Sequence, residues 1–256
     1  MKALITGVTS GIGLEISKVL FSMGYEIIGV SKDLEKLEAL KEKYGYTVYK
    51  LDLSNRQEVL KFCEHIPDVE VFVNNAGFGD LGYFCDTDLS KDLSMIEVNL
   101  VSCHILTKAV LKQMLSKNNG YILNVSSSAS FMPGPLMCTY YSTKSYVTRM
   151  SLAIYEEIRR LGKNVNISVL CPGPVNTNFN NVAGVNFSIK GCSSSYVAKY
   201  AIKKMFKKKL IIIPTIKMKV ACFFSRFIPR KILLKITFNI QRKKKWCFVI
   251  SLILGN

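Results

Sequence analysis

The chain begins with a short apolar strand that runs directly into a glycine-rich loop and then into an amphipathic helix. The strand covers Met1–Thr6, the loop reads TGVTSGIG from Thr6 to Gly13, and the helix continues to about Met23. Glycines at these positions allow a tight turn and let the backbone approach a pyrophosphate, which rests at the helix N-terminus. This start favours a nucleotide-binding α/β fold over a plain strand-to-helix turn.

Further short apolar segments alternate with helical stretches along the chain. The clearest are Glu26–Val30, Val69–Val73, Tyr121–Val125 and Val165–Cys171. Several are nearly continuous apolar runs, as expected for strands covered on both faces, and the alternation predicts a parallel sheet with helices on both sides. We expect a doubly wound, Rossmann-type α/β domain over residues 1–215, followed by a basic, mainly helical extension over residues 216–256.

A tyrosine followed four positions later by a lysine occurs three times, as Tyr46/Lys50, Tyr140/Lys144 and Tyr200/Lys204. The first pair lies in an extended-looking run, and the third lies in a lysine-rich helix with nothing catalytic before it. Only the second pair opens a long helix directly after an apolar strand and its serine-rich end. Residues four apart on a helix are neighbours, and an adjacent ammonium lowers the pKa of a phenol, which makes it a usable proton donor.

Other landmarks follow the glycine loop in a fixed order: Asp52-Leu53, Asn74-Asn75-Ala76-Gly77, Asn99, Ser127, Tyr140/Lys144 and Pro172-Gly173-Pro174-Val175-x-Thr177. With the spacing Thr-Gly-x-x-x-Gly-x-Gly, this order resembles the short-chain dehydrogenase/reductase family over about residues 1–180. The run NNAGFGDLGYF, from Asn74 to Phe84, resembles a subgroup with uncharacterised bacterial oxidoreductases and long-chain 3-oxoacyl-thioester reductases. The resemblance implies an NAD(P)(H)-dependent oxidoreductase that interconverts a carbonyl and an alcohol by hydride transfer.

The resemblance also implies a catalytic set of four residues. Tyr140 acts as the acid in ketone reduction, and Lys144 lowers its pKa and hydrogen-bonds the nicotinamide ribose. Ser127 hydrogen-bonds the substrate oxygen and stabilises the charge that develops on it. Asn99 holds a water that links Lys144 to solvent.

Cofactor contacts are expected from the same ordering. Asp52, at the end of the third strand, bonds the adenine amino group, with Leu53 beside it, and Asn74, Ala76 and Gly77 lie near the adenine ribose. The other expected contacts, with the phosphates and the nicotinamide, are Gly7, Ser10, Gly11, Ile12, Gly13, Ser31, Lys32, Tyr140, Lys144, Pro172, Gly173, Val175 and Thr177.

The end of the second strand bears on the choice between NADP(H) and NAD(H). An NAD site needs an acidic residue there to accept from the ribose 2′-hydroxyl, whereas this chain has Ser31 and Lys32, which suit a 2′-phosphate. Ser10 departs from the family pattern, because many NADP-using relatives carry a basic residue there, and Asp33 adds a nearby negative charge. We predict that NADP(H) is preferred over NAD(H).

An apolar substrate is expected from two segments. Residues 178–195 are predicted to form a lid, with few charges and the apolar residues Phe179, Val182, Val185, Phe187 and Ile189. Phe131, Met132 and Leu136 lie between the catalytic serine and tyrosine. We expect Met132 and Phe179 to contact a hydrophobic substrate, such as a 3-oxoacyl thioester, a steroid-like compound or a lipid ketone. The alternative is that these residues only pack the lid.

Other readings of the chain remain open. Some proteins of this fold are NADP(H)-binding sensors or membrane-associated scaffolds, although the complete catalytic set favours an enzyme. Oligomerisation is expected through the helices Leu100–Leu115 and Tyr140–Leu161. The eight cysteines show no Cys-x-x-Cys pair, so no metal site is expected, and scattered free cysteines suit a reducing cytoplasm. Met1-Lys2 runs straight into the first strand, so no signal peptide is expected.

Charge is distributed unevenly. Residues 1–157 hold 15 Lys and Arg against all 18 Asp and Glu, whereas residues 158–256 hold 20 Lys and Arg and no acid. The basic residues are mixed with Phe, Ile and Leu from Lys217 to Trp246, and the apolar run Trp246–Leu254 is too short to span a bilayer, which needs about 20 residues.

We therefore predict that the extension binds the inner, anionic face of a membrane. A solvated basic face that covers the core, or docking of an acidic partner protein, are the alternatives. Nucleic acid is not an expected partner, because the stretch shows no recognisable binding motif.

Overall fold

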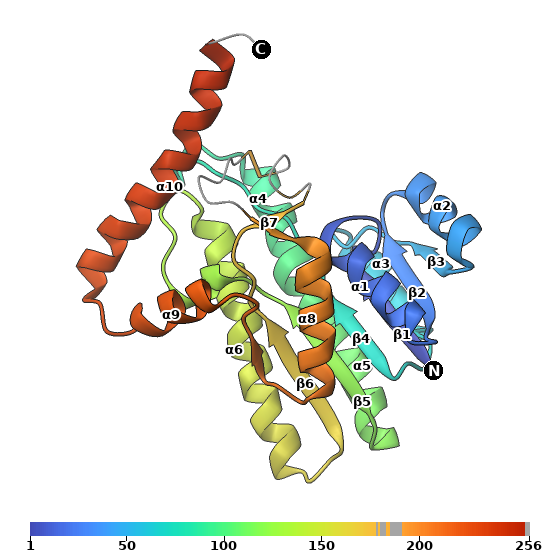
Figure 1. The fold of residues 1–256 in the computed structure, drawn as a ribbon. Coiled ribbons are helices and arrows are strands. Elements are labelled where there is room, and N and C mark those ends of the chain that lie inside the picture. Colours follow the sequence, from blue (N-terminus) through green and yellow to red (C-terminus); the bar gives the residue numbers. More distant parts are fainter. Residues whose placement is uncertain (178, 180–182, 185–190, 254–256) are drawn as a thin grey trace.

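The computed structural model describes residues 1–177, 179, 183–184 and 191–253, with side chains up to residue 243 (Figure 1). Strands are β1 (Lys2–Thr6), β2 (Glu26–Ser31), β3 (Thr47–Lys50), β4 (Val71–Asn74), β5 (Gly120–Val125), β6 (Val165–Leu170), β7 (Val175–Asn176), β8 (Cys192–Ser193) and β9 (Ile211–Ile212). Helices are α1 (Gly11–Ser22), α2 (Leu34–Tyr44), α3 (Arg56–Glu64), α4 (Leu89–Ile96), the π-helix η1 (Glu97–Ser102), α5 (Cys103–Lys117), the 3₁₀-helix η2 (Ser128–Phe131), α6 (Cys138–Arg160), α8 (Ser194–Phe206), α9 (Ile216–Phe224) and α10 (Arg230–Ile253).

One parallel sheet organises the described part of the chain, with the strand order β3-β2-β1-β4-β5-β6-β9. The order reverses between β1 and β4, because β2 and β3 lie on one side of β1 and the later strands lie on the other. In such sheets the ligand crevice opens at the carboxyl ends of the strands, at this point of reversal. Thr6 and Asn74, the last residues of β1 and β4, therefore mark the expected site.

Helices cover both faces of the sheet, as the apolar runs predict. On one face the buried core includes Ile16 and Leu20 of α1, Leu37 of α2 and Val197 of α8. On the other face Val59 of α3, Leu106 and Val110 of α5 and Ile158 of α6 pack against the strands. The predicted doubly wound fold and its helical C-terminal region are confirmed.

Element boundaries agree with the predicted strands to within two residues, with one consequence for the site. Asp52 was expected to end the third strand, but β3 ends at Lys50. The Asp52 Oδ1 atom accepts hydrogen bonds from the backbone N–H and the hydroxyl of Ser54, at 2.9 and 2.8 Å. These bonds form the turn that leads into α3, so Asp52 lies beyond the strand. In the predicted lid, Val182, Val185, Phe187 and Ile189 lie outside the described residues.

The segment Leu89–Lys117, which joins α4, η1 and α5, is the helical stretch in the described residues that is long and apolar enough to cross a membrane. Some of its apolar side chains pack within the fold, since Leu106 and Val110 are fully buried against the sheet. A core helix passes the same test of length and composition, so the segment is read here as part of the core.

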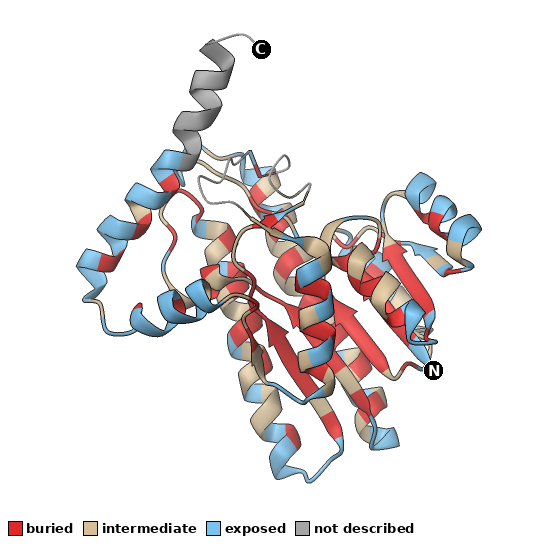
Figure 2. Cartoon of the chain, viewed as in Figure 1, coloured by how far each residue is buried: buried red, intermediate tan, exposed pale blue. Residues whose placement is uncertain are grey.

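The C-terminal helices α9 and α10 lie along one side of the domain, beyond α6 (Figure 1). Figure 2 shows that their described residues are mostly exposed, with a few buried positions on the inner side. Cys222 of α9 and Leu233, Thr237 and Gln241 of α10 are these buried contacts.

Candidate active site

The glycine loop between β1 and α1 leaves the start of α1 open. α2, α3, α4, α8 and α9 each begin with a side chain that accepts a bond from the first turn, but Ser10, at the corresponding position of α1, makes no such bond. Uncapped N–H groups at a helix N-terminus suit a phosphate. Gly11 has a φ of +55°, which favours glycine. A Cβ atom at Gly13 would collide with the carbonyl oxygen of Gly7.

Two side chains that the sequence analysis did not single out hold this loop in place. The Thr6 hydroxyl, at the end of β1, accepts from the backbone N–H groups of Asn75 and Ala76 at 3.0 and 3.1 Å. The Asn75 side-chain amide donates to the carbonyl oxygens of Thr6 and Gly7 at 3.0 and 3.2 Å. Together they lock the end of β4 to the loop. Thr6 belongs to the glycine-loop motif and Asn75 to the Asn74–Gly77 motif, but only the pairing of β1 with β4 shows that the two residues are in contact.

Asn74, expected near the adenine ribose, directs its side chain into the core. Its Nδ2 atom donates to the carbonyl oxygen of Cys103 at 3.0 Å and to the Thr107 hydroxyl at 3.3 Å. The side chain is only 4% exposed. Only the backbone of Asn74 is therefore left to face a nucleotide. Ile12 likewise packs its side chain on the core.

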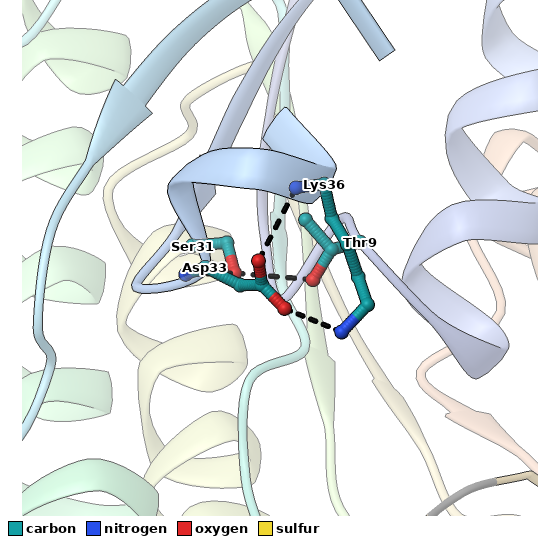
Figure 3. Close-up of polar contacts among 4 residues, drawn as sticks. All are labelled: Thr9, Ser31, Asp33 and Lys36. Carbon is teal, nitrogen blue, oxygen red and sulfur yellow. Dashed lines mark hydrogen bonds and ion pairs between the residues drawn. The ribbon is translucent and has the colours of Figure 1, made fainter. Parts of the chain in front are cut away.

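At the end of β2, the acidic residue is neutralised by its neighbour (Figure 3). Asp33 forms an ion pair with Lys36 and accepts from the Lys36 backbone N–H, so it caps α2. The Lys36 side chain holds the pKa of Asp33 below its usual value. The Ser31 hydroxyl lies 3.1 Å from that of Thr9 and accepts from the Asp33 N–H at 3.3 Å. Lys32 is exposed beside this group. The surroundings of Ser31 are therefore less negative than the sequence suggests.

Two consecutive serines after β5 have different environments. Ser126 is buried, and its hydroxyl donates to the Lys144 carbonyl oxygen at 2.8 Å and lies 2.7 Å from the Thr148 hydroxyl. Ser126 thus fastens β5 to α6. Ser127 is half-buried and lies close enough to the Tyr140 phenol to lower its pKa. Of the two, Ser127 is the one that shares the site with Tyr140.

Tyr140 and Lys144 lie together on α6, as their spacing predicts. The Lys144 Nζ atom is 5.9 Å from the centre of the Tyr140 ring and donates to the Val125 carbonyl oxygen at 3.0 Å. Both side chains are buried, with exposed fractions of 9% and 5%.

The expectation that Lys144 lowers the Tyr140 pKa is not met in this structure. Burial raises the pKa of Tyr140, and the bond from Ser127 opposes this only in part. Burial also lowers the pKa of Lys144 from 10.5 to about 8. The physical reason is that the same apolar surroundings disfavour the phenolate and the ammonium alike.

Asn99 lies on the π-helix between α4 and α5, and π-helical turns are frequent at functional sites. Its side chain accepts from the Phe78 N–H at 3.0 Å and donates to the Phe78 carbonyl oxygen at 2.8 Å and to the Thr143 hydroxyl at 3.2 Å. A Cβ atom at Gly77 would lie 2.8 Å from Asn99 Oδ1 and 3.1 Å from Lys144 Nζ. Asn99 therefore clamps the Gly77–Phe78 backbone beside the lysine.

The segment after β6 closes the site from the other side. A Cβ atom at Gly11 would lie 3.1 Å from Thr177 Cγ2, so Thr177 faces the glycine loop. The Pro172 carbonyl oxygen accepts from the Ser128 N–H at 2.8 Å, which ties this segment to the end of β5. Gly173 lies between Pro172 and Thr177 in the chain. Val175, the first residue of β7, is buried. The residues of the glycine loop and of the Pro172–Thr177 segment fit a dinucleotide that extends from the loop to Tyr140.

Apolar side chains surround Tyr140. The cluster consists of Met95, Ala129, Met137, Tyr140 and Ala183, with Phe78, Leu81, Tyr141 and Phe179 packed against it. The Phe179 and Tyr140 rings are 5.3 Å apart. Met132 directly follows η2 and is half-buried. Leu136 adopts a φ of +65°, a backbone conformation that a bulky residue rarely takes and that often marks a functional site.

Comparison with known proteins agrees with this geometry. The family model for short chain dehydrogenase matches residues 1–185. An uncharacterised oxidoreductase, YvrD, of Bacillus subtilis is 35% identical over 67% of this chain and 67% of its own. A very-long-chain 3-oxoacyl-CoA reductase of Anas platyrhynchos is 30% identical over 76% of this chain and 66% of its own. A short-chain dehydrogenase of Sphingobium yanoikuyae in complex with NADPH superposes with a TM-score of 0.77 at 23% identity, covering 84% of this chain and 88% of its own.

These matches confirm the predicted family, and they include an uncharacterised bacterial oxidoreductase and a very-long-chain 3-oxoacyl-CoA reductase. The chain belongs to the short-chain dehydrogenase/reductase family, whose members are NAD(P)-dependent oxidoreductases that act on CH–OH groups.

Proposed function

We propose that this enzyme reduces the carbonyl group of a hydrophobic substrate with NADPH, with Ser127, Tyr140 and Lys144 as its catalytic residues. The observation that carries the proposal is the contact of Ser127 and Lys144 with Tyr140 inside an apolar cluster. The cofactor, when bound, supplies a hydride to the carbonyl carbon. A 3-oxoacyl thioester, a steroid-like compound or a lipid ketone fits the apolar surroundings.

Each residue has a separate task in this proposal. The Ser127 hydroxyl orients the substrate oxygen and stabilises the charge that develops on it. The Tyr140 phenol gives its proton to that oxygen, and because burial raises its pKa it remains protonated until then. Lys144, next to the phenol, stabilises the phenolate that is left. Asn99 holds the Gly77–Phe78 backbone beside Lys144, and the proposed water-linked proton path begins there.

Replacement of Tyr140 by phenylalanine tests the proposal. Loss of the phenol should lower kcat for a lipophilic ketone by about 10²–10⁴-fold, with NADPH affinity nearly unchanged. Tyr200→Phe is the matched control, because Tyr200 also has a lysine four positions later on a helix. Wild-type protein that binds NADPH but reduces no ketone in a broad panel would instead favour the sensor or scaffold function.

NADP(H) is the preferred cofactor in this proposal. It is supported by Ser31 at the end of β2, by exposed Lys32 beside it and by the neutralisation of Asp33 by Lys36. The kcat/KM values for NADPH and NADH decide it, and a higher value with NADH would contradict the proposal.

We further propose a homo-oligomer formed through α5 and α6 and a cytoplasmic protein that associates peripherally with membranes. Leu111 and Leu115 of α5 and Ile154 and Tyr155 of α6 are only partly buried, which supports pairing through these helices. Light scattering tests the oligomer, and a monomer at all concentrations would contradict it.

Peripheral association is supported by residues 158–256, which contain 20 Lys and Arg and no acid.

A further inference from the structure

The C-terminal helices touch the candidate active site at two points. Met218 of α9 packs on the Pro172–Val175 segment, where a Cβ atom at Gly173 would lie 2.7 Å from Met218 Cγ. Gln241 of α10 donates a hydrogen bond to the Tyr141 hydroxyl. Tyr141 directly follows Tyr140, and the two rings are 6.0 Å apart in an edge-to-face arrangement. The extension thus contacts both the expected nicotinamide pocket and the catalytic helix.

A third contact involves Phe238 of α10. The Phe238 ring of α10 is 6.5 Å from the ring of Tyr83, which belongs to the loop between β4 and α4. Tyr83 and its neighbour Phe84 are 50% and 68% exposed. The inner side of α10 therefore contacts the Tyr83–Phe84 loop, and Phe84 lines a small cavity that reaches Tyr140.

An open groove lies along the inner side of α10. It has a volume of about 380 Å³ and is lined by Pro135, Leu234, Lys235, Phe238 and Asn239. The next residue after Pro135, Leu136, lines a small cavity that reaches Tyr140. Pro135 and Leu136 thus separate an open, largely apolar groove from the catalytic tyrosine.

The outer side of the extension combines exposed apolar groups with cations. Ile216, Phe223, Phe224, Phe227 and Ile232 are 77%, 53%, 57%, 70% and 52% exposed. The rings of Phe223 and Phe227 are 5.5 Å apart, so the aromatic groups form a cluster. Exposed basic residues flank them, namely Lys217, Arg226, Arg230, Lys231, Arg242 and Lys243. No acidic residue occurs after Glu157 in the sequence.

We propose that the outer side of α9 and α10 docks on an anionic phospholipid bilayer and places the substrate entrance at the membrane surface. Aromatic and aliphatic groups that enter the interface, beside cations that meet anionic headgroups, are the pattern of interfacial helices. A lipophilic carbonyl compound then passes from the bilayer along the groove of α10 to Tyr140. The route of the substrate rests on the proposed reductase function, whereas the docking of the extension does not.

Vesicle co-sedimentation tests the docking. Wild-type protein should bind phosphatidylglycerol vesicles and bind phosphatidylcholine vesicles weakly, with a strong dependence on salt. The triple variant Arg226→Glu, Arg230→Glu, Lys231→Glu should lose roughly a hundredfold in affinity for the anionic vesicles. Replacement of both Phe223 and Phe227 by serine should also weaken binding.

Three lysines outside the extension provide the matched control. Lys203→Glu, Lys207→Glu and Lys209→Glu together remove the same charge from exposed positions on α8 and just after it, and should change vesicle affinity far less. Equal losses in both triple variants would overturn the docking surface, as would wild-type binding that does not distinguish anionic from neutral vesicles. Unchanged NADPH affinity shows that each variant is folded.

Kinetics tests the substrate route. With a long-chain methyl ketone dissolved in phosphatidylglycerol vesicles, the Arg226/Arg230/Lys231 variant should raise KM about tenfold, because it docks less. With a short, water-soluble ketone its kcat/KM should match wild type. Equal loss with both ketones, or no loss with either, would overturn the route. If no ketone is reduced in any form, the reductase proposal fails, and vesicle binding still decides the docking.

Discussion

Two Tyr-x-x-x-Lys pairs lie on helices of this protein, and they share their spacing and geometry but differ in burial and in the groups around them. Lys144 Nζ is 5.9 Å from the Tyr140 ring centre on α6, and Lys204 Nζ is 5.5 Å from the Tyr200 ring centre on α8. Tyr140 and Lys144 are buried and contact Ser127 and the Val125 carbonyl oxygen. Tyr200 and Lys204 are half-exposed, and Lys219 also lies over the Tyr200 ring.

This comparison shows that spacing brings the two groups together and that the surroundings decide what they do. A half-exposed pair keeps its contact with solvent, which screens the charge of the ammonium. A buried pair has lost its water, and its protonation depends on the few groups around it. We therefore expect chemistry from the α6 pair alone.

Removal of the lysine should separate the two pairs most sharply. Lys144→Met should lower kcat/KM for a lipophilic ketone by about 10³-fold, because the phenolate left on Tyr140 loses its counter-charge. Lys204→Met should leave it within twofold. Steady-state NADPH oxidation measures both, and similar losses in the two variants would remove the distinction between the pairs.

Ser126 and Ser127 provide a second test of the claim that the surroundings of a residue determine its role. Ser127→Ala should lower kcat by about 10²-fold, because it removes a donor to the substrate oxygen. Ser126→Ala should instead lower the free energy of unfolding by about 1–2 kcal/mol, because Ser126 bonds the α6 backbone. Parallel activity and urea-unfolding assays test the pair, and the reverse assignment would contradict the site.

Burial of Lys144 also predicts a pH-dependent change in stability. Its folded pKa, about 8, lies below the ordinary value of 10.5, so below pH 8 the buried charge destabilises the cofactor-free fold. Lys144→Met should raise the free energy of unfolding at pH 7 by about 1–3 kcal/mol. Between pH 8 and 10.5 the folded lysine loses its proton before the unfolded one, so wild type regains stability and the gap narrows.

Urea unfolding of both proteins across this pH range measures the effect. Lys204→Met, in contrast, should change stability by less than about 0.5 kcal/mol at every pH. A gap between wild type and Lys144→Met that widens with rising pH would contradict the burial argument.

A smaller effect is expected at an exposed lysine that acts through charge alone. Lys36→Ala should lower the preference for NADPH over NADH by about tenfold, because it uncovers the Asp33 carboxylate near the expected 2′-phosphate. Lys41→Ala, which removes an ion pair with Glu38 on the same helix, is the control. An unchanged ratio of the two kcat/KM values in Lys36→Ala would show that Asp33 does not face the cofactor.

Local patterns were sufficient to predict β1, β2, β4, β5 and β6, the helix α1 and the order of the site residues. Strand periodicity and the glycine loop each depend on residues that are neighbours in the sequence. The predicted bounds of β1, the loop and α1 therefore lie close to the observed bounds. Thr6 and Asn75 could not be identified as partners, because their bonds cross from β1 to β4. The contact of Gln241 with Tyr141 joins residues 100 positions apart.

The pKa of Tyr140 was predicted in the wrong direction for a related reason. The spacing shows that Lys144 is near, but not that Met95, Met137 and Phe179 enclose the phenol. Burial then raises the pKa of Tyr140, and the hydrogen bond with Ser127 opposes this only in part. Side chains from several elements create this environment, so one helix alone does not reveal it.

Transfer of the hydride itself tests the central claim most directly. NADPH deuterated at the transferable position of its nicotinamide ring should be incubated with wild-type protein and a long-chain ketone, and the alcohol analysed by mass spectrometry. We expect one deuterium on the carbinol carbon with wild type and with Tyr200→Phe, and almost none with Tyr140→Phe. No label in any alcohol from wild type, despite tight NADPH binding, would contradict the account and favour a sensor of the same fold.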